Sequence, residues 1–239
     1  MIQIFEKSKQ AFGQFNNGEI LENKPIGFPQ DGGDLKPYSN LFYWAHATAI
    51  KDSTIGLHPH RGFEIMTIVL EGKINHYDTL LKQWIALESG DVQLIQSGSG
   101  ISHAESMHKG SKIFQIWFQP NLKNALQKTP GYLDVKKSEL PYSDNIRTIV
   151  GDQSPVILDA EGIEITLHQV GKKHYDYQVD SNFFYSFYII DGKLKINQVH
   201  VKKDDFFKIS EESSVKFEVL QEGRILCIKS PKSTSYPIY

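Results

Sequence analysis

Short apolar runs separated by turns recur along the whole 239-residue chain, and this rhythm limits its fold more than any other feature. In the second half, turns that carry Gly or Asp separate the runs about every 8–12 residues, which is typical of a β-barrel or β-sandwich. Only residues 121–128 have the character of a helix, and that helix is expected to be short. We therefore predict an all-β chain with one or two short helices.

Strands can be assigned from these runs, beginning with a short one at residues 2–5. In the first half, further strands are expected at 41–50, 58–70 (with a break at Arg61-Gly62), 73–78, 83–87, 92–96 and 113–119. In the second half, they are expected at 146–150, 156–158, 163–170, 183–190, 193–197, 205–209, 215–220 and 225–229. Residues 129–145 are interpreted as a connector, so we predict two domains, residues 1–130 and residues 131–239.

The two halves share a pattern of a strand, a turn made of an acidic residue and Gly, and a returning strand. Residues 68–73 have the sequence IVLEGK, and residues 189–193 have the sequence IIDGK. We interpret this similarity as a weak internal repeat, in which one type of β-barrel occurs twice.

Composition and charge exclude several classes of protein. The chain has 26 basic and 28 acidic residues, and its net charge of -2 gives no reason to expect binding to nucleic acid or to an anionic membrane. Cys227 is the only cysteine, so no intramolecular disulfide can form. No apolar run approaches the ~20 residues of a membrane helix, and the charged N-terminal segment does not resemble a secretory signal. We expect a cytoplasmic protein.

Two pairs of residues spaced two apart carry the chemistry of the first half. His58 and His60 form one pair, and His103 and Glu105 form the other. Side chains two apart on a strand project from the same face, so neighbouring strands can direct three imidazoles and one carboxylate at a single point. A single His-x-His is more often an ordinary surface or core feature. The combination, with glycine-bearing turns around both pairs, favours a metal site inside a small β-barrel.

Three neutral imidazoles and one carboxylate leave a net charge of +1 on a divalent ion. In an octahedral site they also leave two open positions, as in non-haem iron sites with an extra His. We expect one divalent metal ion, with Fe(II) as the first choice; Mn, Co, Ni, Cu and Zn can use the same donors. The absence of thiolate ligands argues against a structural zinc site.

Several polar residues near these pairs have two possible roles. Glu64 can hold a ligand His by a hydrogen bond, and Arg61 can pair with Glu64, with a substrate anion or in a surface salt bridge. His76 and Asp78 can support the site, although a structural pair on a strand is the favoured interpretation. Trp117 is expected in the core rather than as a platform for substrate.

Four segments of the chain resemble the pirin family of the cupin superfamily, most densely over residues 56–120: HPHRGFE, VLEGKINHYD, GDVQLIQSGSGISHAE and IFQIWFQP. The resemblance implies a bicupin, with two antiparallel, jelly-roll-like β-barrels face to face and a metal, usually iron, in the N-terminal barrel only. It places the ligands at His58, His60, His103 and Glu105. Glu64 stands where many other cupins have a ligand, but in pirins Glu105 supplies the carboxylate. The C-terminal half has no His-x-His motif and is expected to be structural.

The same resemblance implies a function. Several bacterial pirin-like proteins are similar to quercetin 2,3-dioxygenases, which open a flavonol ring with O2 and release carbon monoxide. The partners would then be O2 and a small phenolic substrate, and Glu105 would take the proton of the flavonol 3-hydroxyl. Eukaryotic pirins suggest instead an iron protein whose redox state regulates protein partners without turnover. A third possibility is a non-catalytic binder of small molecules. At this point it stays open whether the chain is an enzyme.

Overall fold

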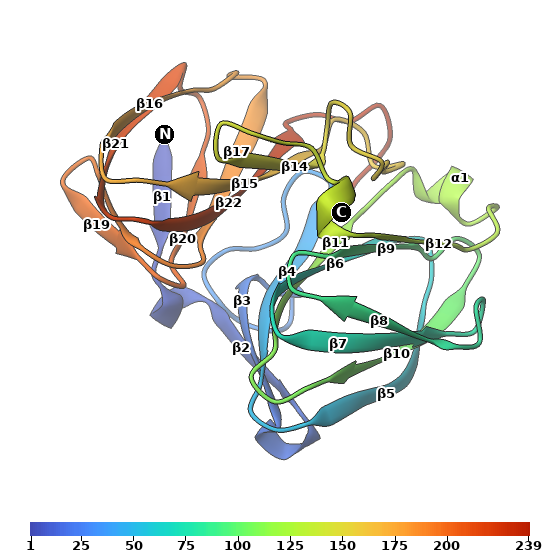
Figure 1. Cartoon of the computed structure of the whole chain (residues 1–239). Helices are drawn as coiled ribbons and strands as arrows, with labels where there is room; N and C mark the ends of the chain where they lie inside the picture. The colour runs from blue at the N-terminus through green and yellow to red at the C-terminus, as the bar shows by residue number, and fades with distance from the viewer. The chain divides into compact units, whose positions relative to one another are not determined.

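The computed structural model describes residues 1–239, and antiparallel β-strands dominate it (Figure 1). The only α-helix is the four-residue α1 (Leu122–Ala125), and the 3-10 helices are η1 (Lys7–Lys9), η2 (Asn16–Gly18) and η3 (Lys137–Glu139). None of the helices has the length and apolar character that a membrane crossing requires. The predicted all-β fold with short helical pieces is confirmed.

The chain forms two compact units, which we call the first and the second barrel. The first barrel comprises Gln10–Glu139, Leu158–Ala160 and Tyr236–Tyr239, and the second comprises Met1–Lys9, Leu140–Ile157 and Glu161–Ser235. The first barrel includes β12 (Gly131–Val135) as an outer strand, and the second barrel includes β1 (Ile2–Phe5) as an outer strand. The division into domains 1–130 and 131–239 stays a prediction.

The first barrel consists of a seven-stranded and a four-stranded sheet. The larger sheet contains, in spatial order, β12 (Gly131–Val135), β9 (Val92–Gln96), β6 (Glu64–Glu71), β11 (Lys112–Phe118), β4 (Leu41–Ala49), β3 (Ile20–Ile26) and β2 (Ala11–Phe15). The smaller sheet contains β5 (Ser53–His60), β10 (Ile101–Met107), β7 (Lys73–Asp78) and β8 (Trp84–Glu88).

The second barrel has sheets of the same two sizes. The larger sheet contains β1 (Ile2–Phe5), β20 (Phe206–Ile209), β17 (Phe183–Ile189), β22 (Gly223–Pro231), β15 (Glu164–Val170), β14 (Ile146–Val150) and β13 (Tyr142–Ser143). The smaller sheet contains β16 (His174–Gln178), β21 (Ser214–Gln221), β18 (Lys193–Ile196) and β19 (Val199–Lys202).

The strands from β4 to β11 and those from β15 to β22 follow the same topology in the same chain order. The small sheets β5-β10-β7-β8 and β16-β21-β18-β19 correspond strand by strand, as do the central pairs β6-β11 and β17-β22. The predicted internal repeat is therefore confirmed, and it extends well beyond the hairpin that suggested it. Gly72 and Gly192 occupy the equivalent hairpin turns, and both need glycine because their φ angles are 78° and 99°.

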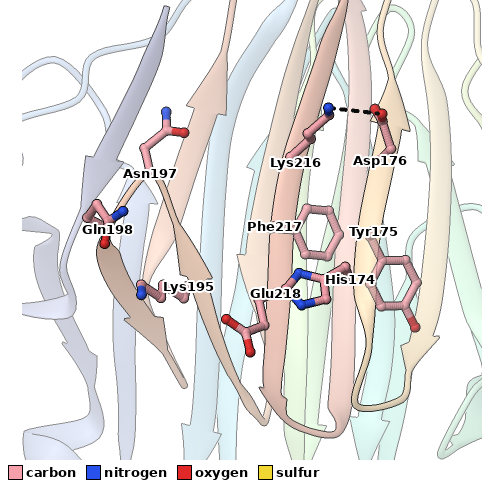
Figure 2. A pocket seen from close by; sticks show the side chains of 9 residues that line it. All are labelled: His174, Tyr175, Asp176, Lys195, Asn197, Gln198, Lys216, Phe217 and Glu218. Atoms are coloured by element: carbon pink, nitrogen blue, oxygen red, sulfur yellow. Dashed lines mark ion pairs between the residues drawn. The ribbon is translucent and has the colours of Figure 1, made fainter.

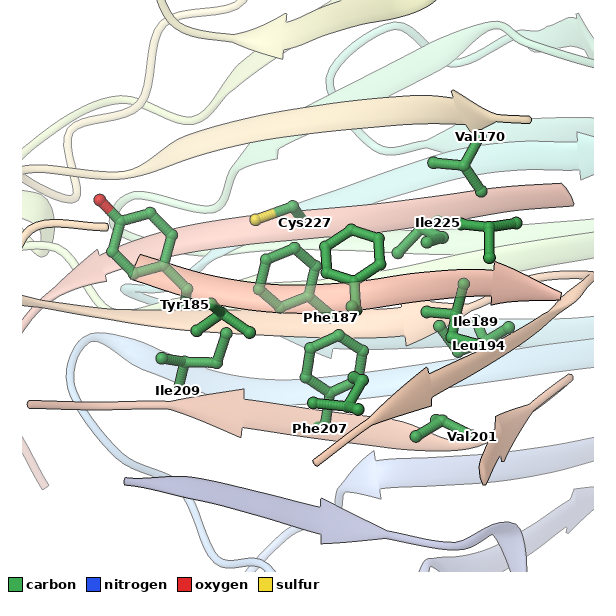
Figure 3. Close-up of a cluster of buried hydrophobic side chains, with 14 residues drawn as sticks. Val170, Tyr185, Phe187, Ile189, Leu194, Val201, Phe207, Ile209, Ile225 and Cys227 are labelled. Carbon is green, nitrogen blue, oxygen red and sulfur yellow. The ribbon is translucent and has the colours of Figure 1, made fainter. Parts of the chain in front are cut away.

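Buried apolar clusters occur in both barrels, and the larger one is in the second. In the first barrel, Val69, Ile74, Met107 and Ile113 belong to one buried cluster. In the second barrel, a larger cluster includes Phe187 and Phe207, whose rings stack 4.6 Å apart (Figure 3). Cys227 packs in this cluster, and burial raises the pKa of its thiol to about 12, which fits a packing role rather than that of a nucleophile.

Some element predictions are wrong, for identifiable reasons. Residues 156–158 form no strand, and Ile157 is 74% exposed although it is apolar. The helix expected over residues 121–128 is only one turn long, because Asn121 caps its start and the chain leaves the helical conformation before Pro130. The expected connector 129–145 contains β12, which pairs with β9. β16 and β19 were not predicted, because polar residues occupy their outward faces.

Candidate metal centre

The two neighbouring strands β5 and β10 supply all four residues that the sequence predicts as ligands. They run antiparallel, with His58 opposite His103 and His60 opposite Ile101. β5 is an edge strand of its sheet, which is the position where a proline such as Pro59 is tolerated. The alternation of the strand then directs His58 and His60 to the same side, toward His103.

His58, His60 and His103, here called the His triad, lie together. One ring nitrogen of each histidine lies within 4.8 Å of the corresponding nitrogens of the other two. Nε2 of His60 is 2.9 Å from Nε2 of His103. Two imidazole nitrogens that bind one ion at about 2.1 Å and at right angles would be about 3.0 Å apart. The observed separation is therefore short enough for both nitrogens to bind the same ion.

Hydrogen bonds and packing fix the orientation of the His triad. Nδ1 of His58 lies 2.8 Å from the backbone oxygen of Gly56, to which it can donate, so that Nε2 is left free to bind an ion. The rings of His58 and His103 are 4.4 Å apart, and those of His60 and His103 are 4.7 Å apart. Nδ1 of His103 is buried and has no hydrogen-bond partner within the protein.

Burial keeps two members of the His triad neutral. The pKa of His60 falls to about 3, first because burial penalises the charged form and then because His103 and His58 repel a proton there. The pKa of His103 also falls to about 3, again chiefly through burial, with further contributions from His58 and His76. Both imidazoles are uncharged at neutral pH, and a neutral imidazole is the form that binds a metal ion.

Glu105 lies inside the same barrel but outside the group formed by the His triad. Its carboxylate is 1% exposed and accepts a hydrogen bond on each oxygen. Thr67 Oγ1 donates to Oε1 at 3.2 Å, and Gln115 Nε2 donates to Oε2 at 2.8 Å. A β-bulge separates His103 from Glu105 in the pairing of β10 with β5. Three of the four predicted ligands are therefore brought together, and the fourth is held beside them.

Glu64 does not hold a ligand His, in contrast to one of the roles considered from the sequence. Its carboxylate accepts hydrogen bonds from the backbone amides of Asp159 at 2.7 Å and Ala160 at 2.8 Å. The side chain of Gln96 donates a third at 2.9 Å. Arg61 is not among its hydrogen-bond partners. Glu64 thus binds the segment Leu158–Ala160 to the first barrel.

His76 and Asp78 form a fully buried pair on β7. Nε2 of His76 lies 2.8 Å from Oδ2 of Asp78, and Oδ1 of Asp78 accepts the backbone amides of Leu80 and Leu81. The ring of His76 stacks on Tyr132 at 5.0 Å. These contacts support the structural role that the sequence favoured, because Asp78 organises the turn after β7.

Aromatic side chains adjoin the His triad on one side. The ring of Trp117 meets His60 edge to face at 4.7 Å. Trp117 also contacts Phe28, Tyr43 and Phe63, with ring centroids 5.2–6.0 Å apart. Trp117 is half-buried and packs against a buried cluster rather than within it. It is also a direct neighbour of a candidate ligand.

Neither Thr67 nor Gln115 was singled out from the sequence as a hydrogen-bond partner of Glu105. Thr67 is 1% exposed and is the single polar residue in the apolar run from Ile65 to Leu70. A lone hydroxyl in an otherwise apolar strand is a signal, because a buried polar group requires a hydrogen-bond partner. Its partner, Glu105, is 38 residues away in the chain.

The second barrel places its polar residues differently. A hollow of about 430 Å³ lies on its small sheet, lined mostly by polar residues that include the exposed His174 and the half-buried Glu218 (Figure 2). His174 lies opposite Glu218 on the neighbouring strand, and the side chains of Lys216 and Asp176 form an ion pair at 3.9 Å. The inward residues of the same two strands are apolar or aromatic, among them Tyr175 and Phe217.

A family model described as Pirin matches residues 35–118, a span that includes all four predicted ligands. A Pseudomonas aeruginosa protein provisionally named a quercetin 2,3-dioxygenase is 28% identical over 203 residues, which are 82% of this chain and 85% of that protein. A Zymomonas mobilis protein with the same provisional name is 39% identical, but over 80 residues that span about a third of each chain.

The same architecture occurs in a solved structure. YhhW from Escherichia coli matches 99% of this chain and 100% of its own, with a TM-score of 0.83 and 20% identity. A second structure, of the bacterial pirin YhhW in complex with nickel(II), covers 98% of this chain and 100% of its own, with a TM-score of 0.80 and 20% identity. Together with the two repeated barrels, this likeness establishes the bicupin fold.

Proposed function

This chain belongs to the pirin family of cupins, and from that membership we propose that it is a metal-dependent oxygenase of the quercetin 2,3-dioxygenase type. The proposed reaction is the cleavage of a flavonol, or of a related phenolic ring, by O2. The observation that carries the proposal is the convergence of His58, His60 and His103 in the interior of the first barrel. The names of the relatives support the choice of reaction.

The chain's own residues would divide the work among them. His58, His60 and His103 would hold the ion, with Glu105 as a fourth ligand or as a general base. When bound, a divalent ion supplies Lewis acidity toward the phenolic hydroxyl and redox capacity toward O2. Glu105 would take the hydroxyl proton on Oε1, because the hydrogen bond from Thr67 to that oxygen is the longer of its two. Trp117 covers one side of His60 and keeps water from that side.

We propose Fe(II) as the native ion. Three imidazoles with an adjacent carboxylate suit borderline ions that also accept an oxygen donor, and among these Fe(II) supports O2 chemistry. The nickel(II) complex concerns YhhW and shows what that protein can bind. Elemental analysis of protein purified without added metal tests the choice: we expect about one iron per chain, and one equivalent of another metal would contradict it.

Oxygen uptake by iron-loaded protein with quercetin tests the activity. We expect consumption of O2 by the wild type, its loss in His58→Ala and His103→Ala, and a large reduction in Glu105→Ala. His174→Ala is the matched control, because His174 is an exposed histidine of the second barrel and is not part of the His triad. The assignment fails if the loaded wild type consumes no O2 with any phenolic tested, or if the triad variants consume it as fast as the wild type.

A second function, a redox-sensing iron protein that acts through protein partners, is supported by one observation. The small sheet that carries His58, His60 and His103 exposes apolar side chains at both of its edges: Leu57 is 57% exposed and Trp84 is 51% exposed. Exposed apolar residues of this size are common in protein interfaces. Pull-down experiments with ferrous and ferric protein discriminate between the two functions. Identical partners in both states would contradict the regulatory one.

A further inference from the structure

The carboxylate of Glu105 is held from the opposite side of the first barrel. Glu105 lies on β10 of the small sheet, whereas Thr67 lies on β6 and Gln115 on β11, both in the large sheet. Thr67 and Gln115 face each other directly in the pairing of their strands. Their side chains reach one carboxylate oxygen each, at 3.2 Å and 2.8 Å. Two adjacent strands thus present a pair of donors to one buried anion.

Both donors are uncharged at any ordinary pH. A hydroxyl and an amide can each donate one hydrogen bond to the carboxylate without gaining or losing a proton. A carboxylate has about four lone-pair directions, so either oxygen can accept this bond and still have a direction free for a cation. The two donors therefore restrict where the carboxylate lies without neutralising it.

The second barrel shows what these two positions contain where no carboxylate is held. Thr67 stands five residues before the turn glycine Gly72, and Phe187 stands five residues before the equivalent Gly192. Gln115 is paired with Thr67, and Cys227 is paired with Phe187. In the second barrel, the two positions thus carry buried apolar residues of the core. The polar pair is present only in the barrel that has Glu105.

We propose that Thr67 and Gln115 are positioning residues that hold Glu105 beside the His triad and so set the affinity and coordination of the metal ion. We call the two residues the carboxylate clamp. The inference rests on the metal site of the proposed function, but not on the reaction. Gln115 contributes more than Thr67, because its hydrogen bond is shorter. Residues that orient a metal ligand in this way typically change metal affinity by about 10–100-fold when removed.

Binding of Co(II) to the full-length, metal-free chain tests the carboxylate clamp without any turnover. We expect Gln115→Leu to raise the Kd for Co(II) by about 10–100-fold and Thr67→Val to raise it by a smaller factor. Both variants are also expected to change the visible absorption of bound Co(II), which reports coordination. Thr67→Ser restores the hydroxyl and is expected to bring both the Kd and the spectrum back to those of the wild type.

Gln93→Leu is the matched control. Gln93 is also a buried glutamine of the large sheet and is paired with Thr67, but its amide makes no hydrogen bond to Glu105. We expect its Co(II) affinity and spectrum to equal those of the wild type. Thermal melting of each variant shows whether it is folded, and Thr67→Val, which preserves the side-chain shape, remains informative if Gln115→Leu does not fold.

Two results would overturn the inference. One is a wild-type Kd and a wild-type Co(II) spectrum in both Gln115→Leu and Thr67→Val. The other is an equal loss of affinity in Gln93→Leu, which would point to a general effect on the barrel. A failure of the proposed oxygenase function gives a different result. The wild type and the variants would then bind Co(II) with the expected differences in Kd, while the iron-loaded wild type would consume no O2 with quercetin.

Discussion

The two barrels of this chain share one topology, and their interiors differ in kind. β4 to β11 and β15 to β22 occupy equivalent places in the two pairs of sheets. The interior of the first barrel contains the His triad, Glu105 and the carboxylate clamp, whereas aromatic and aliphatic residues fill the second. The scaffold therefore does not require a polar interior. The comparison teaches that the residues of the candidate metal site are an addition to a barrel that can be closed by apolar packing alone.

The largest expected effect comes from replacing a candidate ligand of the first barrel by an apolar aromatic residue, such as those in the core of the second barrel. We expect His103→Phe to weaken metal binding by more than about 100-fold, beyond the range for residues that only orient a ligand. The fold is expected to persist, because Phe217 packs inward on the equivalent strand of the second barrel. Elemental analysis and thermal melting measure the two parts. Stoichiometric metal in folded His103→Phe would refute the role of His103.

The second prediction compares the stability that one core position contributes in each barrel. Phe187 is 3% exposed and stacks on Phe207, so Phe187→Ala is expected to lower the free energy of unfolding by about 3–5 kcal/mol. Thr67→Ala at the corresponding position of the first barrel removes only a hydrogen bond and a methyl group, with a cost of about 1–2 kcal/mol. Urea denaturation measures both changes. Equal costs would mean that the two interiors contribute alike to stability.

A third prediction concerns a feature that the barrels share. Asp91 accepts the backbone amides of Glu88 and Lys137, each at 3.0 Å. Asp205 accepts those of Lys202 and Lys7, also at 3.0 Å. In each barrel, one buried aspartate thus connects two segments. One is the turn before a strand of the large sheet, and the other is the segment that follows the outer strand of that sheet.

Since the two arrangements are alike, Asp91→Ala and Asp205→Ala are expected to cost similar amounts, about 2 kcal/mol each. Burial alone would raise the pKa of Asp91, but hydrogen bonds from Lys136 and the two amides lower it. The contribution of Asp91 to the free energy of unfolding is therefore fully present above the unfolded pKa of about 3.9. It is lost as the pH falls through the pKa of Asp91 in the folded chain. Denaturation of both variants near neutral pH measures the costs. A much larger cost at one site would show that the barrels differ in scaffold as well as interior.

Much of the fold could be predicted from the sequence, because burial of one or both faces leaves a clear pattern. The run from Ile65 to Leu70 is apolar except for Thr67 and is buried throughout. The His-x-His spacing predicted the convergence of His58 and His60, because the alternation of a strand fixes where its side chains point. The hairpin turns at Gly72 and Gly192 revealed the repeat, because both require a positive φ.

The remaining features depend on contacts between residues distant in the chain. β12 has only five residues, and its partner β9 lies some 35 residues before it, so nothing local marks it as a strand. The backbone amides that Glu64 binds are 95 and 96 residues away. The position of Glu105 beside the His triad depends on Thr67 and Gln115, which neither its spacing from His103 nor its own strand can reveal.

The smallest expected effect concerns the half-buried imidazole of His168 in the second barrel. It lies 2.8 Å from Thr166 Oγ1, and burial lowers its pKa to about 4. Unfolding restores a value of about 6.5, so the unfolded chain binds up to one proton more at His168 between pH 6.5 and pH 4. Stability is therefore expected to fall as the pH decreases through this window, and His168→Gln is expected to reduce that slope by up to one proton.

The midpoint of urea denaturation at several pH values measures the slope. His174→Gln is the control, since His174 is exposed on the same barrel. The same slope in His168→Gln and wild type would show that His168 gains its proton without unfolding, and that the interior of the second barrel admits water. The contrast between an apolar barrel and one with a polar interior would then be weaker than the packing indicates.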